Sequence, residues 1–130
     1  MRELAAVIVG AIVGTGLRFG FDTVIPHTDD QFPLSTLLIN VVGSFALGFL
    51  VARVWPTAAP WLKAGLGPGL LGSFTTFSAV AVSFVALSTH DLLWLAAVYL
   101  VVSVTLGFLG ALVGIRLGGG RAPRIDAVNE

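Results

Sequence analysis

Residues 92–117 read LLWLAAVYLVVSVTLGFLGALVGIRL, a run whose only polar residues are Tyr99, Ser103, Thr105 and Arg116. A helix needs roughly 20 apolar residues to cross the hydrocarbon core of a bilayer, so this run is long enough. Strands of a transmembrane barrel alternate between polar and apolar residues, and this run does not. The stretch therefore predicts a membrane-spanning helix.

Three further apolar runs precede it, at residues 4–21, 34–54 and 61–87, with short connections between them. A polar, glycine-rich tail follows at residues 118–130. Such a chain requires lipid rather than water as its solvent. The sequence therefore predicts a single all-α integral membrane domain, residues 1–130, with four transmembrane helices.

The composition excludes several classes of function. Of the 130 residues, 11% are charged, whereas about a quarter are charged in a soluble domain. The net charge is zero and the body of the chain has no basic run, which argues against nucleic-acid binding. There is no cysteine, and no nucleophile–base pair, metal-ligand cluster or phosphate loop stands out in the sequence. An enzyme is therefore not expected.

The charged residues are divided unequally between the two sides of the membrane. With four spans, one side receives both termini and the second connection, and with them Arg2, Arg53, Lys63, Arg116, Arg121 and Arg124. The other side receives Asp22, Asp29, Asp30 and Asp91. Because cytoplasmic loops carry the excess of Lys and Arg, both termini are predicted to be cytoplasmic.

Pairs of glycines four residues apart occur in three of the predicted spans. Small residues at this spacing let helix backbones approach closely in a membrane. They are compatible with packing inside one protomer and equally with a dimer interface, and the sequence leaves both open. The pairs are Gly10 with Gly14, Gly65 with Gly69, and Gly110 with Gly114.

The middle of the third predicted span, residues 72–78, reads GSFTTFS. Glycine, serine and threonine are weak helix formers. A break here would free carbonyls to bind a cation and would aim helix-end amides at an anion. The alternative is a continuous helix whose hydroxyls bond back to the preceding turn, and the pattern alone favours this alternative.

Two other polar side chains within predicted spans are candidates for a functional role. Asn40 is a neutral donor that can bind an anion without trapping it by charge, although a hydrogen bond between helices is the commoner role. Arg18, near the end of the first span, is either functional or extends to the membrane interface. No predicted span contains the Asp or Glu that a proton-coupled cation exporter uses as a relay.

Four segments, one in each predicted span, together resemble the Fluc/CrcB family of small bacterial fluoride channels. Residues 10–18 fit its first-helix GxxxGxxxR pattern, and residues 36–45, TLLINVVGSF, fit its TLxxNxxGSF motif. Residues 72–78 resemble its third-helix signature. Its fourth helix carries a tyrosine and a serine four residues apart, as do Tyr99 and Ser103.

The resemblance implies a fold and a function. Members are four-helix protomers of the bacterial inner (plasma) membrane that assemble as antiparallel dimers, with the third helix broken at the motif. Each dimer has two narrow pathways for the passive export of cytoplasmic fluoride, which confers fluoride resistance. The resemblance thus implies a channel rather than a catalyst.

The resemblance also assigns roles to residues. Backbone carbonyls of Gly72 and Thr75, from both subunits, would hold a structural Na⁺ at the dimer centre. Phe77 would offer fluoride its ring edge, which is the positive part of an aromatic ring, and Asn40 would donate a hydrogen bond. Arg18 would lie near one mouth. The rest of the polar path would be lined by Thr76, Ser78, Tyr99 and Ser103.

The chain departs from the family's usual TTFSTF at two positions. Residues 75–80 read TTFSAV, so Val80 stands at the second pore phenylalanine and Ala79 at the preceding threonine. Valine has no aromatic edge and alanine has no hydroxyl. We therefore expect the fluoride path that uses these two positions to be impaired.

The charge asymmetry also bears on assembly. An antiparallel homodimer needs chains inserted in both orientations, whereas this chain's bias favours one orientation. We therefore predict one half of a heterodimeric pair with a homologous partner. The alternative is a self-sufficient homodimer that tolerates Val80. Two rival functions remain: a small drug exporter, which lacks its membrane acid here, and a non-conducting accessory subunit.

Overall fold

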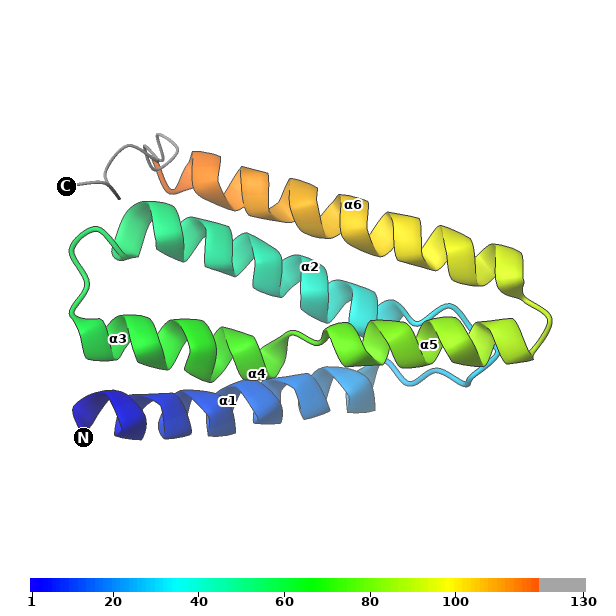
Figure 1. Cartoon of the computed structure of the whole chain (residues 1–130), viewed down its shortest axis with the longest axis horizontal. Coiled ribbons are helices and arrows are strands. Elements are labelled where there is room, and N and C mark those ends of the chain that lie inside the picture. The colour runs from blue at the N-terminus through cyan, green and yellow to red at the C-terminus, as the bar shows by residue number, and fades with distance from the viewer. Residues whose placement is uncertain (120–130) are drawn as a thin grey trace, which may run out of the picture.

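The computed structural model describes residues 1–119 as four helical spans, each long and apolar enough to cross a membrane (Figure 1). The described residues contain no strand, so the predicted all-α membrane fold is confirmed. The predicted tail lies outside the described residues from residue 120 onward. The elements are α1 (Arg2–Val24), α2 (Leu34–Phe49), η1 (Leu50–Val54), α3 (Pro60–Ala64), η2 (Gly65–Leu71), α4 (Gly72–Phe74), α5 (Phe77–Thr89) and α6 (Leu93–Leu117).

The spans alternate in direction, so the connections gather at two ends of the bundle (Figure 1). One end has the start of α1, the connection from η1 to α3 and the close of α6. We call it the basic end, because it carries Arg2, Arg53, Lys63 and Arg116. The opposite, acidic end carries Asp22, Asp29, Asp30 and Asp91. Two further predicted cations, Arg121 and Arg124, lie outside the described residues.

The third span is not one continuous helix. Pro68 lies inside η2, where it lacks an amide hydrogen and its ring crowds the preceding turn, and the wider π-helical turn accommodates both effects. Farther along, Thr75 and Thr76 have extended backbones, with ψ angles of 156° and 119°. The break implied by the family resemblance is confirmed. The preference of the residue pattern for a continuous helix is wrong.

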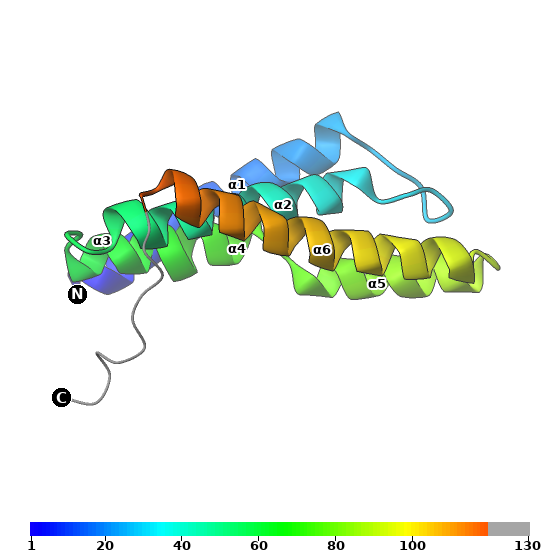
Figure 2. The same ribbon diagram turned by 90° about the horizontal axis from the view of Figure 1, so that it is seen from above.

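The break gives the two halves of the third span different neighbours. The half formed by α3, η2 and α4 packs against α1, whereas α5 packs against α6 and α2 and makes no contact with α1. Figure 2 shows the divergence: beyond the break, α5 runs beneath α6 while α1 tilts away. A continuous helix would not reach both sets of neighbours.

All three glycine pairs lie at contacts within the protomer, which answers the question that the sequence left open. A Cβ on Gly10 or Gly14 would overlap a backbone carbonyl oxygen of η2, and Gly69 faces the Val7 carbonyl. On the other side of the bundle, Gly110 and Gly114 face the α2 backbone. These glycines therefore set the close approach of α1 to η2 and of α6 to α2.

The buried core lies in the half of the bundle toward the acidic end, where α2, α5 and α6 meet. Its members are Leu37, Val80, Leu87, Ala96 and Tyr99. By contrast, only Gly10 and Gly14 are buried on α1, and its large apolar side chains are mostly exposed. The outward face of α1 is therefore suited to lipid or to a partner chain.

Candidate functional site

The backbone at the break is held by the side chain of Asn40 on α2. Asn40 Nδ2 donates to the Thr76 carbonyl at 2.9 Å, and the Thr76 amide donates to Asn40 Oδ1 at 2.8 Å. The carboxamide thus replaces the helical acceptor that the Thr76 amide loses, and it gives the carbonyl of Thr76, the N-cap residue of α5, an additional donor. A carboxamide nitrogen has two hydrogens, so one N–H of Asn40 is left over for another acceptor.

Side-chain hydrogen bonds of Thr75, Thr76 and Ser78 stabilise the helix ends on either side of the break. Thr75 Oγ1 donates back to the Leu71 carbonyl at 2.9 Å, which closes the first half. Thr76 Oγ1 accepts from the Ala79 amide at 3.1 Å and so caps the first turn of α5. The Ser78 hydroxyl lies 3.0 Å from Thr76 Oγ1. Ser78 therefore contacts the cap and not the cavity described next.

Two carbonyls are released by this arrangement. In a continuous α-helix, the Gly72 carbonyl would accept from the Thr76 amide, and the Thr75 carbonyl from the Ala79 amide. Both amides instead bond to side chains, those of Asn40 and Thr76. The carbonyls freed in this way belong to Gly72 and Thr75, the two residues that the resemblance associates with Na⁺. Unwound carbonyls in membrane helices are typical Na⁺ ligands, so this donor set fits that ion.

A cavity of about 470 Å³ opens at the break, between α2, α5 and α6. We call it the break cavity. Four of the predicted pathway residues line it: Asn40, Thr76, Phe77 and Ser103. No charged residue is among its lining residues. Phe77 is 77% exposed in the single protomer, so its ring is open to lipid or to a partner.

Tyr99 lies behind the break cavity and does not line it. It is fully buried, and its ring meets Phe32 edge-on with centroids 5.4 Å apart. Among residues 1–119, neither its hydroxyl nor that of Ser103 has a hydrogen-bond partner, although both atoms are buried. Because both oxygens are shielded from solvent, neither hydroxyl opens into the break cavity in the single protomer.

Arg18 lies apart from these residues. It is partly buried on α1, one turn beyond Gly14 on the same face of the helix, and lines neither the break cavity nor the cavity at the acidic end. Within one protomer, Arg18 therefore shares neither cavity with the other predicted pathway residues. Its place near a pore mouth stays a prediction.

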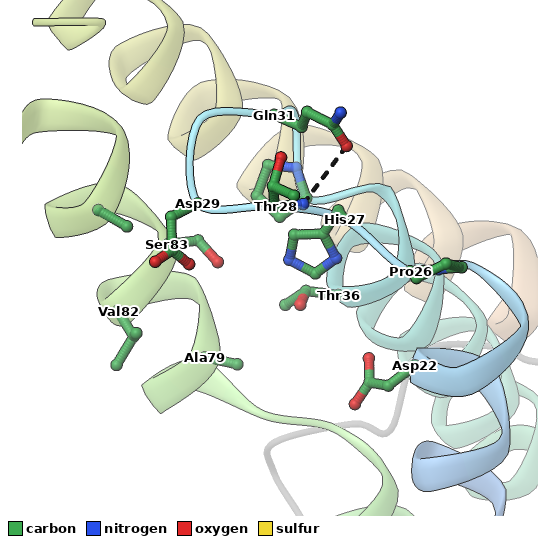
Figure 3. Close-up of a pocket in the computed structure, with 12 residues that line it drawn as sticks. Asp22, Pro26, His27, Thr28, Asp29, Gln31, Thr36, Ala79, Val82 and Ser83 are labelled. Carbon is green, nitrogen blue, oxygen red and sulfur yellow. Dashed lines mark hydrogen bonds between the residues drawn. The ribbon is translucent and has the colours of Figure 1, made fainter. Parts of the chain in front are cut away.

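A second cavity, of about 390 Å³, lies at the acidic end (Figure 3). Figure 3 shows the loop residue Asp29 on the side of Ser83 and the ring of His27 on the side of Thr36, with Asp22 reaching in from the end of α1. Nearby, the Thr28 hydroxyl hydrogen-bonds Asp30 and holds the pKa of that exposed carboxyl below its usual value. The surroundings of this cavity are therefore negatively charged at neutral pH.

The two departures from the family signature face different surroundings. Ala79 lines the cavity at the acidic end, whereas Val80 lines the break cavity and is only 4% exposed, packed in the core with Leu37 and Tyr99. Consecutive helical residues point about 100° apart, which explains the separation. The missing hydroxyl at residue 79 therefore affects the cavity at the acidic end, and the missing ring at residue 80 affects the break cavity.

Comparison with known proteins agrees with this architecture. The family described as CrcB-like protein, Camphor Resistance (CrcB), matches residues 5–115, which include all four spans and the break. The chain belongs to the CrcB family. The four segments that resemble CrcB motifs lie in the expected order, one in each span of the structure.

Relatives of this CrcB chain align over most of their own length. "Fluoride-specific ion channel FluC 2" of Halalkalibacterium halodurans is 38% identical, over 95% of this chain and 91% of the relative. "Fluoride-specific ion channel FluC" of Ignicoccus hospitalis is 38% identical, over 88% and 93%. "Fluoride-specific ion channel FluC 1" of Staphylococcus aureus is 34% identical, over 88% and 94%. Similarity therefore covers the whole fold.

Sequence reasoning gave no role to three hydroxyl residues near the CrcB site. Ser44 lines the break cavity, and Thr36 and Ser83 line the cavity at the acidic end. Thr36, Asn40 and Ser44 are four residues apart, so they share one face of α2, and this spacing was a usable signal. Ser83 gives no comparable signal, because its position depends on how α5 packs after the break.

Proposed function

We propose that this chain is a subunit of a fluoride-selective channel that lets cytoplasmic fluoride leave the cell passively. The observation that carries the proposal is the break cavity. It combines Asn40, which keeps one N–H without an acceptor, and the exposed ring of Phe77, with no charged residue in its lining. Neutral donors attract a small anion yet hold it weakly enough to release it. The names of the relatives support fluoride as that anion.

The test is fluoride efflux from liposomes that contain this chain purified together with a co-expressed homologous partner, followed with a fluoride electrode. We expect fluoride to leave the vesicles passively while chloride is retained. Vesicles without protein provide the baseline. A proton gradient that drives uptake of an organic cation, with no fluoride flux, would support the rival drug-exporter function instead.

Replacing Phe77 by leucine is expected to lower the fluoride flux by about tenfold or more. Leucine keeps an apolar side chain but removes the positive ring edge, whose interaction with an anion we take as comparable to a hydrogen bond to a charged group. Phe19→Leu is the matched control, because Phe19 is 73% exposed on α1 and lines neither cavity described above. Equal fluxes for the two variants would favour the accessory-subunit function.

The assembly that we propose is an antiparallel dimer with a homologous chain of the plasma membrane. Phe77 is exposed where a partner would cover it, and numbered names among the relatives suggest paired genes. The basic and acidic ends of this chain favour one orientation, with both termini cytoplasmic. Because an antiparallel dimer needs a second chain in the opposite orientation, we infer a heterodimeric pair. A homodimer that tolerates Val80 is the alternative.

The chain's lack of cysteine makes its orientation measurable. A single cysteine at Thr57, in the connection at the basic end, should react with a membrane-impermeant maleimide only after cells are opened. Labelling of half the molecules in intact cells would mean dual insertion and would support the homodimer. Fluoride efflux from liposomes containing this chain alone would likewise support the homodimer.

We also propose that the released carbonyls of Gly72 and Thr75 hold a structural Na⁺ together with those of the partner chain. The diverted amides described above support this, because each leaves a carbonyl oxygen without its helical partner. Bound Na⁺ would stabilise the break electrostatically. Replacing Na⁺ by a larger cation is then expected to weaken the dimer.

A further inference from the structure

A groove runs beside α1, along the first half of the third span. It has a volume of about 220 Å³ and lies between α1, α3 and η2. All of its lining residues are apolar or glycine, and they include Ala6, Val9, Val13, Trp61, Leu66 and Leu70. We call it the α1 groove. Lipid tails are as apolar as leucine, so apolar walls alone do not select one occupant in a membrane.

Toward the basic end, the α1 groove adjoins a cavity of about 500 Å³ that has a cation in its lining. Ala6, Val9 and Trp61 line both, and the second cavity adds Ala5 and Arg2. Arg2 is exposed and is the only charged residue in either lining. A guanidinium-bearing residue therefore stands at one end of an apolar groove.

Trp61 stands where the apolar and the charged parts meet. It follows Pro60 at the start of α3, is 46% exposed and lines both cavities. Tryptophan is enriched at the interface between membrane and water, where one part of its ring is in hydrocarbon and its N–H is among the headgroups. Arginine can lay its aliphatic stem on apolar surface while its guanidinium reaches the same polar layer. The outer end of the site therefore suits a headgroup, and the inner part suits an acyl chain.

The charge at the outer end selects the kind of lipid. Guanidinium binds phosphate through two parallel hydrogen bonds, and Arg53 and Lys63 add positive charge at the same end of the bundle. In the orientation proposed above, this end faces the cytoplasmic leaflet, whose surface potential is negative because it contains anionic lipids. A zwitterionic headgroup carries a cation of its own and gains less from these charges. An anionic phospholipid is therefore favoured.

The α1 groove is separate from the place where we expect the partner chain. Figure 1 shows α1 and α6 at opposite edges of the bundle, and the two helices make no contact. The break cavity lies between α2, α5 and α6 and shares no lining residue with the α1 groove. A partner that covers Phe77 is therefore placed away from this groove.

We propose that the α1 groove and the adjoining cavity bind one anionic phospholipid, with its phosphate at Arg2 and an acyl chain along Val9 and Val13. Between Ala6 and Val13 the groove follows α1 for about 10 Å, which accommodates part of an acyl chain. The lipid fills the space beside a helix whose only buried residues are Gly10 and Gly14. This site does not depend on fluoride conduction or on Na⁺.

Quenching by brominated lipid tests the site, because bromine on an acyl chain quenches an indole only at close range. Trp94→Phe removes a tryptophan that is 66% exposed and leaves Trp61 as the only emitter in the lining of the groove. The vesicles contain phosphatidylcholine and a small fraction of brominated lipid. We expect brominated phosphatidylglycerol to reach half-maximal quenching at about a fivefold lower mole fraction than brominated phosphatidylcholine. Trp61→Phe, which keeps Trp94, is expected to show no such preference.

The role of Arg2 is tested in the Trp94→Phe background. Arg2→Gln should remove the preference for phosphatidylglycerol and leave quenching by phosphatidylcholine unchanged. Arg116→Gln is the matched control, because Arg116 is an exposed cation at the same end, in the last turn of α6, and lines neither cavity. It should keep the preference. Loss of the preference in both variants would mean general attraction to an anionic surface and would overturn the site.

Two other results would also disprove the proposal. Equal quenching of Trp61 by the two brominated lipids would mean ordinary lipid beside the helix, without a headgroup site. Weak quenching of Trp61 by both lipids would mean that protein covers the groove, as a partner chain would.

Thermal unfolding in detergent provides a readout that needs no tryptophan variant. A ligand that binds only the folded protein raises its Tm. Added phosphatidylglycerol is expected to raise the Tm of the original chain and of Arg116→Gln more than phosphatidylcholine does, and to lose this advantage in Arg2→Gln. Equal shifts with both lipids in the original chain would contradict the proposal. Neither readout involves fluoride, so failure of this site and failure of the channel function are distinguishable.

Discussion

Gly14→Ala is expected to prevent the chain from folding stably, although it adds a single methyl group. Gly14 is buried against η2, and a Cβ there would overlap the Leu70 carbonyl oxygen. The obstacle is backbone, which cannot rotate aside as a flexible side chain would. Forcing extra volume into a packed contact costs about 1–3 kcal/mol, and more when backbone must move. Because α1 packs only against the first half of the third span and α2, the whole helix would be displaced.

The same substitution two residues along α1 is the control. Gly16 has no atom within 4 Å of the position of its Cβ, so Gly16→Ala should fold as well as the original chain. Urea unfolding of both proteins in the same detergent, with size-exclusion profiles, measures the difference. Equal stability of the two variants would mean that α1 approaches η2 less closely than the structure indicates.

Asn40→Ala is expected to reduce fluoride flux by about 100-fold or more. The substitution removes a side-chain donor from the lining of the break cavity and leaves the amide of Thr76 unpaired. Each buried, unsatisfied polar group costs about 1–3 kcal/mol, and 1.4 kcal/mol corresponds to a factor of ten. Asn40→Asp should be as damaging, because its carboxylate oxygens would face the Thr76 carbonyl without a donor between them.

Liposome efflux measures this effect, and unfolding in detergent separates loss of the pathway from loss of the fold. Val42→Ala is the control on the same helix, since Val42 is 45% exposed and lines neither the break cavity nor the cavity at the acidic end. An Asn40→Ala protein that conducts normally would show that the break is maintained without the carboxamide and that fluoride takes another route.

The four spans could be predicted because they depend on a local property, the length of each apolar run. The break could not be predicted from the pattern, since Thr75 also makes the back-bond to the preceding turn expected of a continuous helix. What decides the matter is the partner of Thr76, which comes from Asn40, 36 positions earlier in the chain. Only the family resemblance carried that information.

The candidate site was predicted in part for a similar reason. Asn40, Thr76, Phe77 and Ser103 meet at one cavity, whereas Arg18 lies elsewhere and Tyr99 is set behind it. The place of Tyr99 could not be predicted, because whether its ring lines the cavity or packs behind it depends on how α6 meets α2 and α5.

The interrupted third span has a consequence for how the protein is made. With 13 residues, α5 is about 20 Å long, which is shorter than the hydrocarbon core of about 30 Å. Neither half of the span therefore settles across the bilayer by itself, and the bare peptide groups between them would meet lipid. Synthesis proceeds from the N-terminus, so α2 is in the membrane before the threonines leave the ribosome. Because α2 precedes the third span in the chain, the carboxamide of Asn40 is available to pair with the interrupted backbone as soon as the third span is made.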